Sequence, residues 1–300
     1  MTCDSNIGDG MPYTHRLYTP TRITKLFGLY FIVDCWHHRI IYSDVVDRPV
    51  GEWKTLDDDL AGPHSIVSDG SIYVAEDTGR HRLRVYVKGA SGFEVRQIVA
   101  GVGNRPHRVR YESGTGLFYV VGSIDQSIHV FRNVGDRLRR VRSKAVGELN
   151  GQYTRSITIR GGKLHFVGAD DIVTFRILGE DVEFLSRLPL AAPYRGANDL
   201  HFFPDGSGLF ASTPQKLYFF RRLEELSAGN AADISRIVRG TPYYADEFDG
   251  ALWVPEITEY SRIVRYAMEG SAVNFADGRV LFDFGKPTPA SELRFAALPQ

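Results

Sequence analysis

Two histidines in matching contexts have side chains suited to acid–base chemistry. His64 lies in Gly62-Pro63-His64-Ser65-Ile66, and His107 lies 43 residues later in Arg105-Pro106-His107-Arg108-Val109. Neutral imidazole is the usual general base near neutral pH and a common ligand of Zn²⁺. Glu76 lies on the predicted strand that pairs with the His64 strand, and it adds a carboxylate. We expect His64, His107 and Glu76 to be catalytic; a divalent metal ion held by His64 and His107 is allowed but not required. The alternative is that both imidazoles only hydrogen-bond to neighbouring backbone.

The histidines belong to a set of positions that recurs every 42 to 48 residues. Its six members are Arg22, His64, His107, Arg155, Asn198 and Tyr244. The two arginines suit a carboxylate or phosphate, because a guanidinium offers a planar fork of donors. We expect Arg22, Arg155, Asn198, Tyr244 and Glu256 to bind a substrate. The alternative for the arginines is an ion pair with Asp34, Asp170 or Glu256.

Each of these positions opens a unit made of short apolar strands and polar loops. One copy, Tyr73–Tyr86, recurs in altered form as Phe31–Tyr42, Tyr119–Phe131 and Leu252–Tyr266. A repeat of this length built from strands is typical of a β-propeller. The spacing predicts one all-β domain over residues 1–300, a six-bladed β-propeller with four antiparallel strands per blade. For blade 2 the predicted strands are His64–Ser68, Ser71–Glu76, Arg82–Lys88 and Phe93–Ala100.

Three segments depart from the regular repeat. Glu224–Gly229 is a polar insertion that can be helical. The outer strand of the last blade is either Arg279–Phe284 or the N-terminal stretch Tyr13–Thr19. Arg137–Lys144 is the strongest basic run and falls on the outer strand of blade 3, where it is either a solvated edge or a contact for an anionic partner.

Composition narrows the classes of function. The chain has 300 residues, zero formal net charge and a pI near 7.1, which speaks against a nucleic-acid partner. No apolar run is long enough for a membrane span, and Met1–Asn6 does not resemble a signal peptide, so we expect a cytoplasmic protein with no membrane partner. Cys3 and Cys35 are not expected to form a structural disulfide.

The loop motif resembles the NHL repeat, an apolar strand followed by Asp-x-x-x-His-Arg. Asp34 with His38-Arg39 matches it, as does Asp77 with His81-Arg82. Gly62–Ile66 together with Ile72–Glu76 is also similar to the blade signature of virginiamycin B lyase-like propellers. That resemblance implies an active-site role for His64 and Glu76. Blade 3 departs from it, with Val121-Gly122 at the place of the glutamate.

Propeller geometry predicts where these side chains meet. The starts of the innermost strands and the ends of the second strands lie on one face, around a central channel mouth. The leading hypothesis is an enzyme of lyase, hydrolase or isomerase type that acts there on a small anionic molecule. The alternative is a non-catalytic NHL propeller that binds a protein or a glycan. No oligomeric state is predicted.

Overall fold

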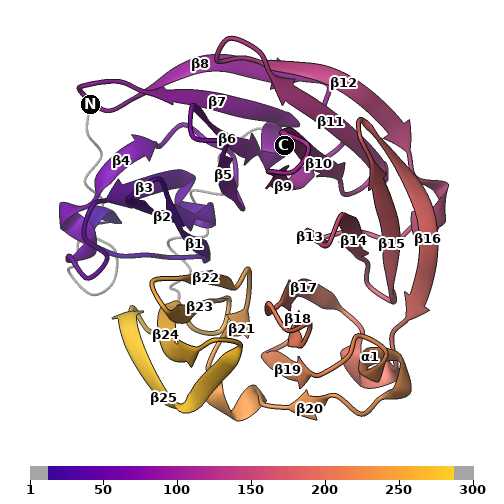
Figure 1. Ribbon diagram of the computed structural model, residues 1–300. Coiled ribbons are helices and arrows are strands. Elements are labelled where there is room, and N and C mark those ends of the chain that lie inside the picture. The colour runs from indigo at the N-terminus through magenta and orange to yellow at the C-terminus, as the bar shows by residue number, and fades with distance from the viewer. Residues whose placement is uncertain (1–12, 287–300) are drawn as a thin grey trace. The chain divides into compact units, whose positions relative to one another are not determined.

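The computed structural model describes residues 13–286, which are built almost entirely of strands (Figure 1). Six antiparallel sheets follow one another along the chain, five of four strands and the last of five. The predicted fold class, an all-β six-bladed β-propeller, is confirmed. No helix among the described residues has the length and apolar character needed to cross a membrane.

The chain divides into two compact units, and unit 1 comprises Met1–His64 and Arg236–Gln300. Blade 1 consists of β1 (Pro20–Leu26), β2 (Leu29–Asp34), β3 (Arg39–Ser43) and β4 (Lys54–Asp57). Blade 6 consists of β21 (Thr241–Pro242), β22 (Asp246–Phe248), β23 (Ala251–Ile257), β24 (Arg262–Glu269) and β25 (Ala272–Asp283). Because β25 pairs with β24, the outer strand of the last blade comes from the C-terminal alternative. Tyr13–His15 is a 3-10 turn.

Unit 2 comprises Ser65–Ser235 and contains blades 2 to 5. Blade 2 has β5 (Ile66–Ser68), β6 (Ile72–Asp77), β7 (Arg82–Lys88) and β8 (Phe93–Ala100). Blade 3 has β9 (Pro106–Glu112), β10 (Leu117–Gly122), β11 (Ser127–Asn133) and β12 (Leu138–Ala145). Blade 4 has β13 (Ser156–Arg160), β14 (Lys163–Val167), β15 (Asp171–Leu178) and β16 (Asp181–Pro189). Blade 5 has β17 (Ala197–Phe202), β18 (Gly208–Ser212), β19 (Lys216–Phe220) and β20 (Ala232–Asp233).

Several predicted boundaries agree closely with these strands. The last two strands of blade 2 begin and end where predicted, and the first two differ by one or two residues. The polar insertion in blade 5 contains the short helix α1 (Glu225–Ala228). The basic run of blade 3 lies on its outer strand, β12.

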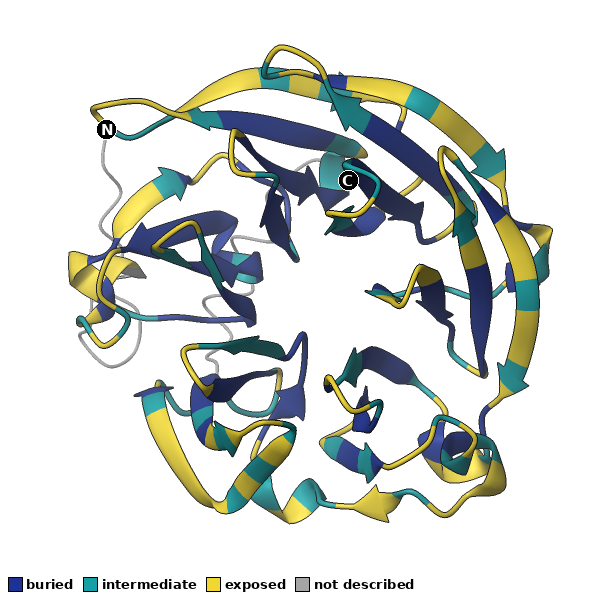
Figure 2. Cartoon of the chain, viewed as in Figure 1, coloured by how far each residue is buried: buried dark blue, intermediate teal, exposed yellow. Residues whose placement is uncertain are grey.

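The core lies between consecutive blades because strand side chains alternate between the two faces of each sheet. Between blades 2 and 3, for example, Val74 and Val85 join Val120 and Phe131 in one buried cluster. In unit 1, blades 1 and 6 share a cluster that contains Ile32 and Trp253. The fourth strands β8, β12 and β16 are largely exposed, as the yellow segments of Figure 2 show.

The recurring acidic residue and arginine form a structural ion pair. Asp34 pairs with Arg39 at 3.0 Å, and Asp77 pairs with Arg82 at 2.6 Å. Glu256 and Arg262 face each other in the matching register of blade 6 and are 2.7 Å apart. Burial by itself raises the pKa of Asp34, but His37, Arg39 and the Thr19 N–H together hold it well below its ordinary value.

The histidine of the motif links each blade to the loop that begins the next one. Nδ1 of His38 accepts a hydrogen bond from the Gly62 N–H at 3.1 Å, and Nδ1 of His81 accepts one from Arg105 at 3.0 Å. In blade 3, Oε1 of Gln126 takes the same place and accepts from the Gly151 N–H at 2.9 Å. His38, His81 and Gln126 all have a left-handed backbone, with φ of 57°, 54° and 52°. The Asp-x-x-x-His-Arg motif therefore has a structural explanation.

Candidate functional site

The register of the innermost strands corrects the predicted set of equivalent positions. Arg22 pairs with Val33 one residue before the end of β2. In blades 3 and 5 the residues that pair in this way are Arg108 and Asp199, and in blade 4 Ser156 pairs with Val167, the last residue of β14. The predicted equivalents in these blades, His107, Arg155 and Asn198, lie one residue too early. His107 and Asn198 are the additional residues of β-bulges and correspond to Thr21, the bulge residue of blade 1, rather than to Arg22.

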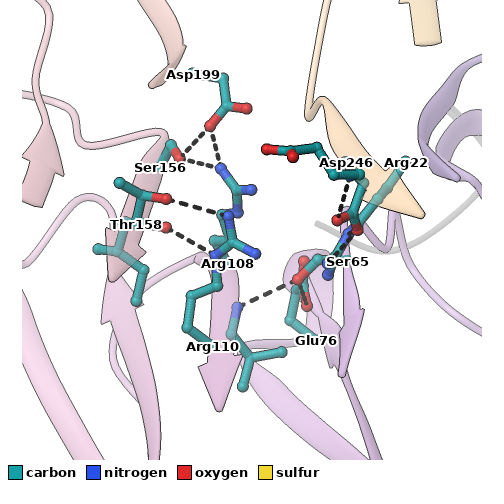
Figure 3. A network of polar contacts seen from close by, with 12 residues as sticks. Arg22, Ser65, Glu76, Arg108, Arg110, Ser156, Thr158, Asp199 and Asp246 are labelled. Carbon is teal, nitrogen blue, oxygen red and sulfur yellow. Dashed lines mark hydrogen bonds and ion pairs between the residues drawn. The ribbon is translucent and has the colours of Figure 1, made fainter. Parts of the chain in front are cut away.

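Three residues of the corrected set contact one another in unit 2 (Figure 3). The buried guanidinium of Arg108 donates to Oγ of Ser156 and to Oδ1 of Asp199. Ser156 Oγ also donates to Asp199 Oδ1 at 2.8 Å. Two residues further along β9, Arg110 donates to Oγ1 of Thr158 at 3.2 Å. The strands β9, β13 and β17 therefore lie side by side at this level.

His107, Arg155 and Asn198 each immediately precede one member of this contacting triplet, so they begin neighbouring strands at one level. Asn198 is completely buried, and neither its amide oxygen nor its amide nitrogen has a hydrogen-bond partner among residues 13–286. The same holds, within that range, for Oδ2 of Asp199 and Oγ of Ser212, which ends β18 of the same blade. Buried polar atoms in native proteins are nearly always hydrogen-bonded. The start of blade 5 is therefore a candidate place for a polar ligand.

Tyr153 brings two predicted site residues together. Its ring lies edge-to-face with His107, with 5.8 Å between the ring centroids. The Cζ atom of Arg155 lies 5.5 Å from the centroid of the same ring. His107 is buried, whereas Arg155 is partly exposed. Sequence reasoning missed Tyr153 because it does not stand at a repeat position.

Glu76 is buried near the end of β6 in blade 2 and is linked through Ser65 to β9 of blade 3. One of its carboxylate oxygens accepts a hydrogen bond from Ser65 Oγ at 3.0 Å. Ser65 Oγ in turn accepts from the Val109 N–H at 3.2 Å. Glu76 thus fixes the beginning of β9, where His107 stands.

The predicted site residues of unit 1 have different neighbours. Arg22 forms an ion pair with Asp246 at 2.7 Å, a partner that was not among the three expected. Nε2 of His64 lies 3.7 Å from Sγ of Cys35, and its ring is 6.2 Å from that of Tyr243. Tyr244 is buried and forms a single parallel bridge with Arg22.

Glu256 lies in a buried network of hydrogen bonds and an ion pair. It is completely buried, and its Oε2 accepts hydrogen bonds from the N–H groups of Arg239 and Gly240 at 2.8 and 2.7 Å. Its other oxygen lies in the ion pair with Arg262. This environment is the blade 6 version of the repeat's acid–arginine pair.

The metal ion predicted at His64 and His107 stays a prediction. No group of three or more His, Cys, Asp or Glu side chains within residues 13–286 is arranged to hold a metal. The predictions for Cys3 and for Met1–Asn6 concern residues outside the described range.

Comparison with known proteins supports the fold. No protein-family model and no curated protein matches the sequence. The structure is similar to that of a proposed 6-phosphogluconolactonase from Bacteroides uniformis, with 12% identity over 90% of this chain and 88% of that chain and a TM-score of 0.63. A proposed 6-phosphogluconolactonase from Bacteroides fragilis gives 13% identity, coverages of 85% and 82% and a TM-score of 0.60. A protein from Lactobacillus plantarum gives 14% identity, coverages of 85% and 79% and a TM-score of 0.54.

At these identities the similarity shows the fold alone. The resemblance to NHL-repeat and virginiamycin B lyase-like proteins stays a prediction, as does the cytoplasmic location.

Proposed function

We propose that the protein is a hydrolase that acts on a small anionic molecule at the strand starts of unit 2. The observation that carries the proposal is Asn198, a buried amide that lacks a hydrogen-bond partner within the described range and stands level with His107 and Arg155. Leaving such a group unsatisfied costs about 1–3 kcal/mol. A ligand that hydrogen-bonds to the Asn198 amide removes this cost, and its binding is favoured by that amount.

Each residue of the site has a distinct role in this proposal. The partly exposed guanidinium of Arg155 binds the anionic group of the substrate. The imidazole of His107 takes a proton from water while the water oxygen bonds to the carbonyl carbon, and returns it to the alkoxide when the carbon–oxygen bond breaks. The N–H₂ group of Asn198 donates to the carbonyl oxygen, where negative charge develops. Glu76 is a positioning residue, because it acts on His107 only through the start of β9.

The structural neighbours favour hydrolysis over the other reaction types considered. The name 6-phosphogluconolactonase describes hydrolysis of an ester bond within a molecule that carries a phosphate. We therefore propose a lactone or ester with a phosphate or carboxylate group as the substrate. The proposal needs no metal ion.

The proposal is tested by measuring hydrolysis of a panel of phosphorylated and carboxylated lactones by proton release. We expect His107→Gln and Asn198→Ala each to lower kcat by about 100-fold. Arg155→Lys keeps the charge but loses the planar fork, so it should mainly raise KM. The matched control is His81→Gln, which changes a structural imidazole of the same unit and should leave turnover unchanged.

Two results would overturn the proposal. One is the absence of turnover with every compound of the panel, which is what a protein-binding or glycan-binding propeller would give. The other is turnover that survives in both His107→Gln and Asn198→Ala.

A further inference from the structure

A hydrogen-bonded chain of four side chains runs across blade 3, separate from the strand starts. Ser143 Oγ on β12 lies 2.9 Å from Nδ1 of His129 on β11. Nε2 of His129 lies 2.8 Å from Ser127 Oγ, which lies 3.0 Å from Oδ2 of Asp125. The strand geometry explains the arrangement, because alternate residues share a face and His129 lies directly opposite Ser143.

The direction of this chain is fixed at its acidic end. An ionised carboxylate only accepts hydrogen bonds, so the hydroxyl of Ser127 donates to Asp125. Ser127 then accepts from Nε2–H of His129, which leaves Nδ1 of the neutral ring as an acceptor. The hydroxyl of Ser143 therefore donates to Nδ1. Ser143 thus donates its hydroxyl proton to the basic nitrogen Nδ1, while Ser127 and Asp125 orient the ring through Nε2. This is the arrangement that activates nucleophilic serines.

Exposure and charge fit this chemistry. Ser143 is exposed, whereas His129 is only 6% exposed. Burial, together with the positive charge of Arg140, lowers the pKa of His129, so the ring is neutral at neutral pH and can take a proton. Arg140 pairs with Phe131, two residues from His129, and its Cζ lies 5.4 Å from the Phe131 ring centroid. A cation at this place favours an anionic reactant and the oxyanion formed from it.

Two glycines make room for the orienting groups. A Cβ atom on Gly103 would lie 2.7 Å from Ser127 Oγ, and one on Gly122 would overlap the carboxylate of Asp125. Gly122 also stands where blades 1 and 2 have Asp34 and Asp77, so blade 3 replaces the acid of the repeat with Asp125 from the following loop. This departure from the repeat places the Asp125 carboxylate where it reaches Nε2 of His129 through Ser127.

We propose that Ser143 is a nucleophile that accepts an acyl group from a small anionic acyl donor, with His129 as its base and Asp125 and Ser127 as positioning residues. Ser143 Oγ bonds to the carbonyl carbon, the bond from that carbon to the leaving oxygen breaks, and the hydroxyl proton passes to His129 Nδ1. The product is an O-acylserine and a released anion. None of these residues belongs to the hydrolase site proposed above.

The test uses the full chain and acetyl phosphate, with intact mass and peptide mapping as the readout. We expect addition of one acetyl group to Ser143 and none at that position in Ser143→Ala. His129→Gln keeps a hydrogen-bonding side chain between the serines but has no basic nitrogen, so acetylation should slow by about 100-fold with an unchanged thermal midpoint. Asp125→Asn should slow acetylation by about tenfold, because it weakens the orientation of the ring.

A fluorophosphonate gives a second readout that does not depend on the acyl donor. It should label Ser143 in the wild-type protein with loss of fluoride. The proposal is overturned if neither reagent modifies Ser143, or if His129→Gln reacts at the wild-type rate. The latter result would leave the chain as a purely structural link between β11 and β12.

Discussion

Two buried carboxylates, Asp34 in unit 1 and Asp199 in unit 2, meet arginines but differ in how completely they are satisfied. Oδ1 of Asp34 accepts from the N–H groups of Tyr18 and Thr19 at 2.9 and 3.0 Å, and Oδ2 contacts His37 and Arg39. Asp199 binds Arg108 and Ser156 through Oδ1 alone, while Oδ2 has no partner within the described range. Asp34 belongs to the Asp-x-x-x-His-Arg motif and Asp199 does not. Polar residues of this motif stabilise the fold, and polar residues at the strand starts are the candidates for function.

The largest expected effect on the free energy of unfolding comes from removing the fully hydrogen-bonded carboxylate of Asp34. Asp34→Ala leaves Arg39, which is 3% exposed, without its buried counter-charge. We expect the free energy of unfolding to fall by about 3–5 kcal/mol, measured by urea denaturation. Because the pKa of Asp34 is lowered in the folded protein, this stabilisation is present above about pH 4 and declines as the pH falls below that. A loss below about 1 kcal/mol would contradict the contrast with Asp199.

A buried histidine in blade 4 gives a second, pH-dependent effect. Burial, with smaller contributions from Lys163 and Arg160, lowers the pKa of His165 to about 4. The unfolded chain takes up this proton near pH 6.5, so stability is complete above that pH and falls by about 3 kcal/mol between pH 7 and pH 4. Denaturation curves of wild type and His165→Gln should differ in this slope. Parallel curves for the two proteins would show that His165 is not the titrating group.

Removal of the Asn198 amide should not lower the free energy of unfolding, in contrast to removal of the Asp34 carboxylate. Asn198→Ala removes two buried polar atoms that lack partners within residues 13–286, so the unfolding free energy should stay constant or rise by about 1 kcal/mol. Asn198→Asp has nearly the same shape but adds a buried charge, and serves as a destabilising comparison. If Asn198→Ala instead destabilises the protein as Asp34→Ala does, the amide has a structural role.

The smallest effect is expected from exchanging the residues that link consecutive blades. His81 and Gln126 both accept one backbone hydrogen bond from a left-handed position. His81→Gln and Gln126→His should therefore each change the unfolding free energy by less than about 0.5 kcal/mol. Replacement of either residue by Ala leaves a backbone N–H without its acceptor and should cost about 1 kcal/mol. If the Ala variants and the exchange variants change the unfolding free energy equally, His81 and Gln126 do not share this role as hydrogen-bond acceptors.

The sequence predicted the blades well because the strand–loop–strand unit recurs at a regular spacing. Arg82–Lys88 and Phe93–Ala100 begin and end as predicted, since short loops that contain glycine separate these strands from their neighbours.

The candidate site was harder to predict because its residues depend on register and on distant partners. Spacing alone does not show whether a residue belongs to the strand pairing or to a bulge, so the paired residue Arg22 was matched with the bulge residues His107 and Asn198. The partner of Arg22, Asp246, lies 224 residues away in the chain. Asp125 replaces the acid missing at Gly122 from a different place in the loop, so a search for the motif does not find it.

The bulges at the strand starts make the identity of one side chain independent of the packing and register of its strand, which are usually coupled in a β-sheet. In a regular strand, a changed side chain alters the packing of the same face, and a shift of one residue reverses every side chain after it. The residue in a bulge stands outside the paired ladder, so its side chain can be exchanged while the strand behind it keeps its register and its core contacts. Threonine, histidine and asparagine already occupy this position in blades 1, 3 and 5 of one chain. A scaffold of this kind can acquire different chemistry at its strand starts without a change in its packing.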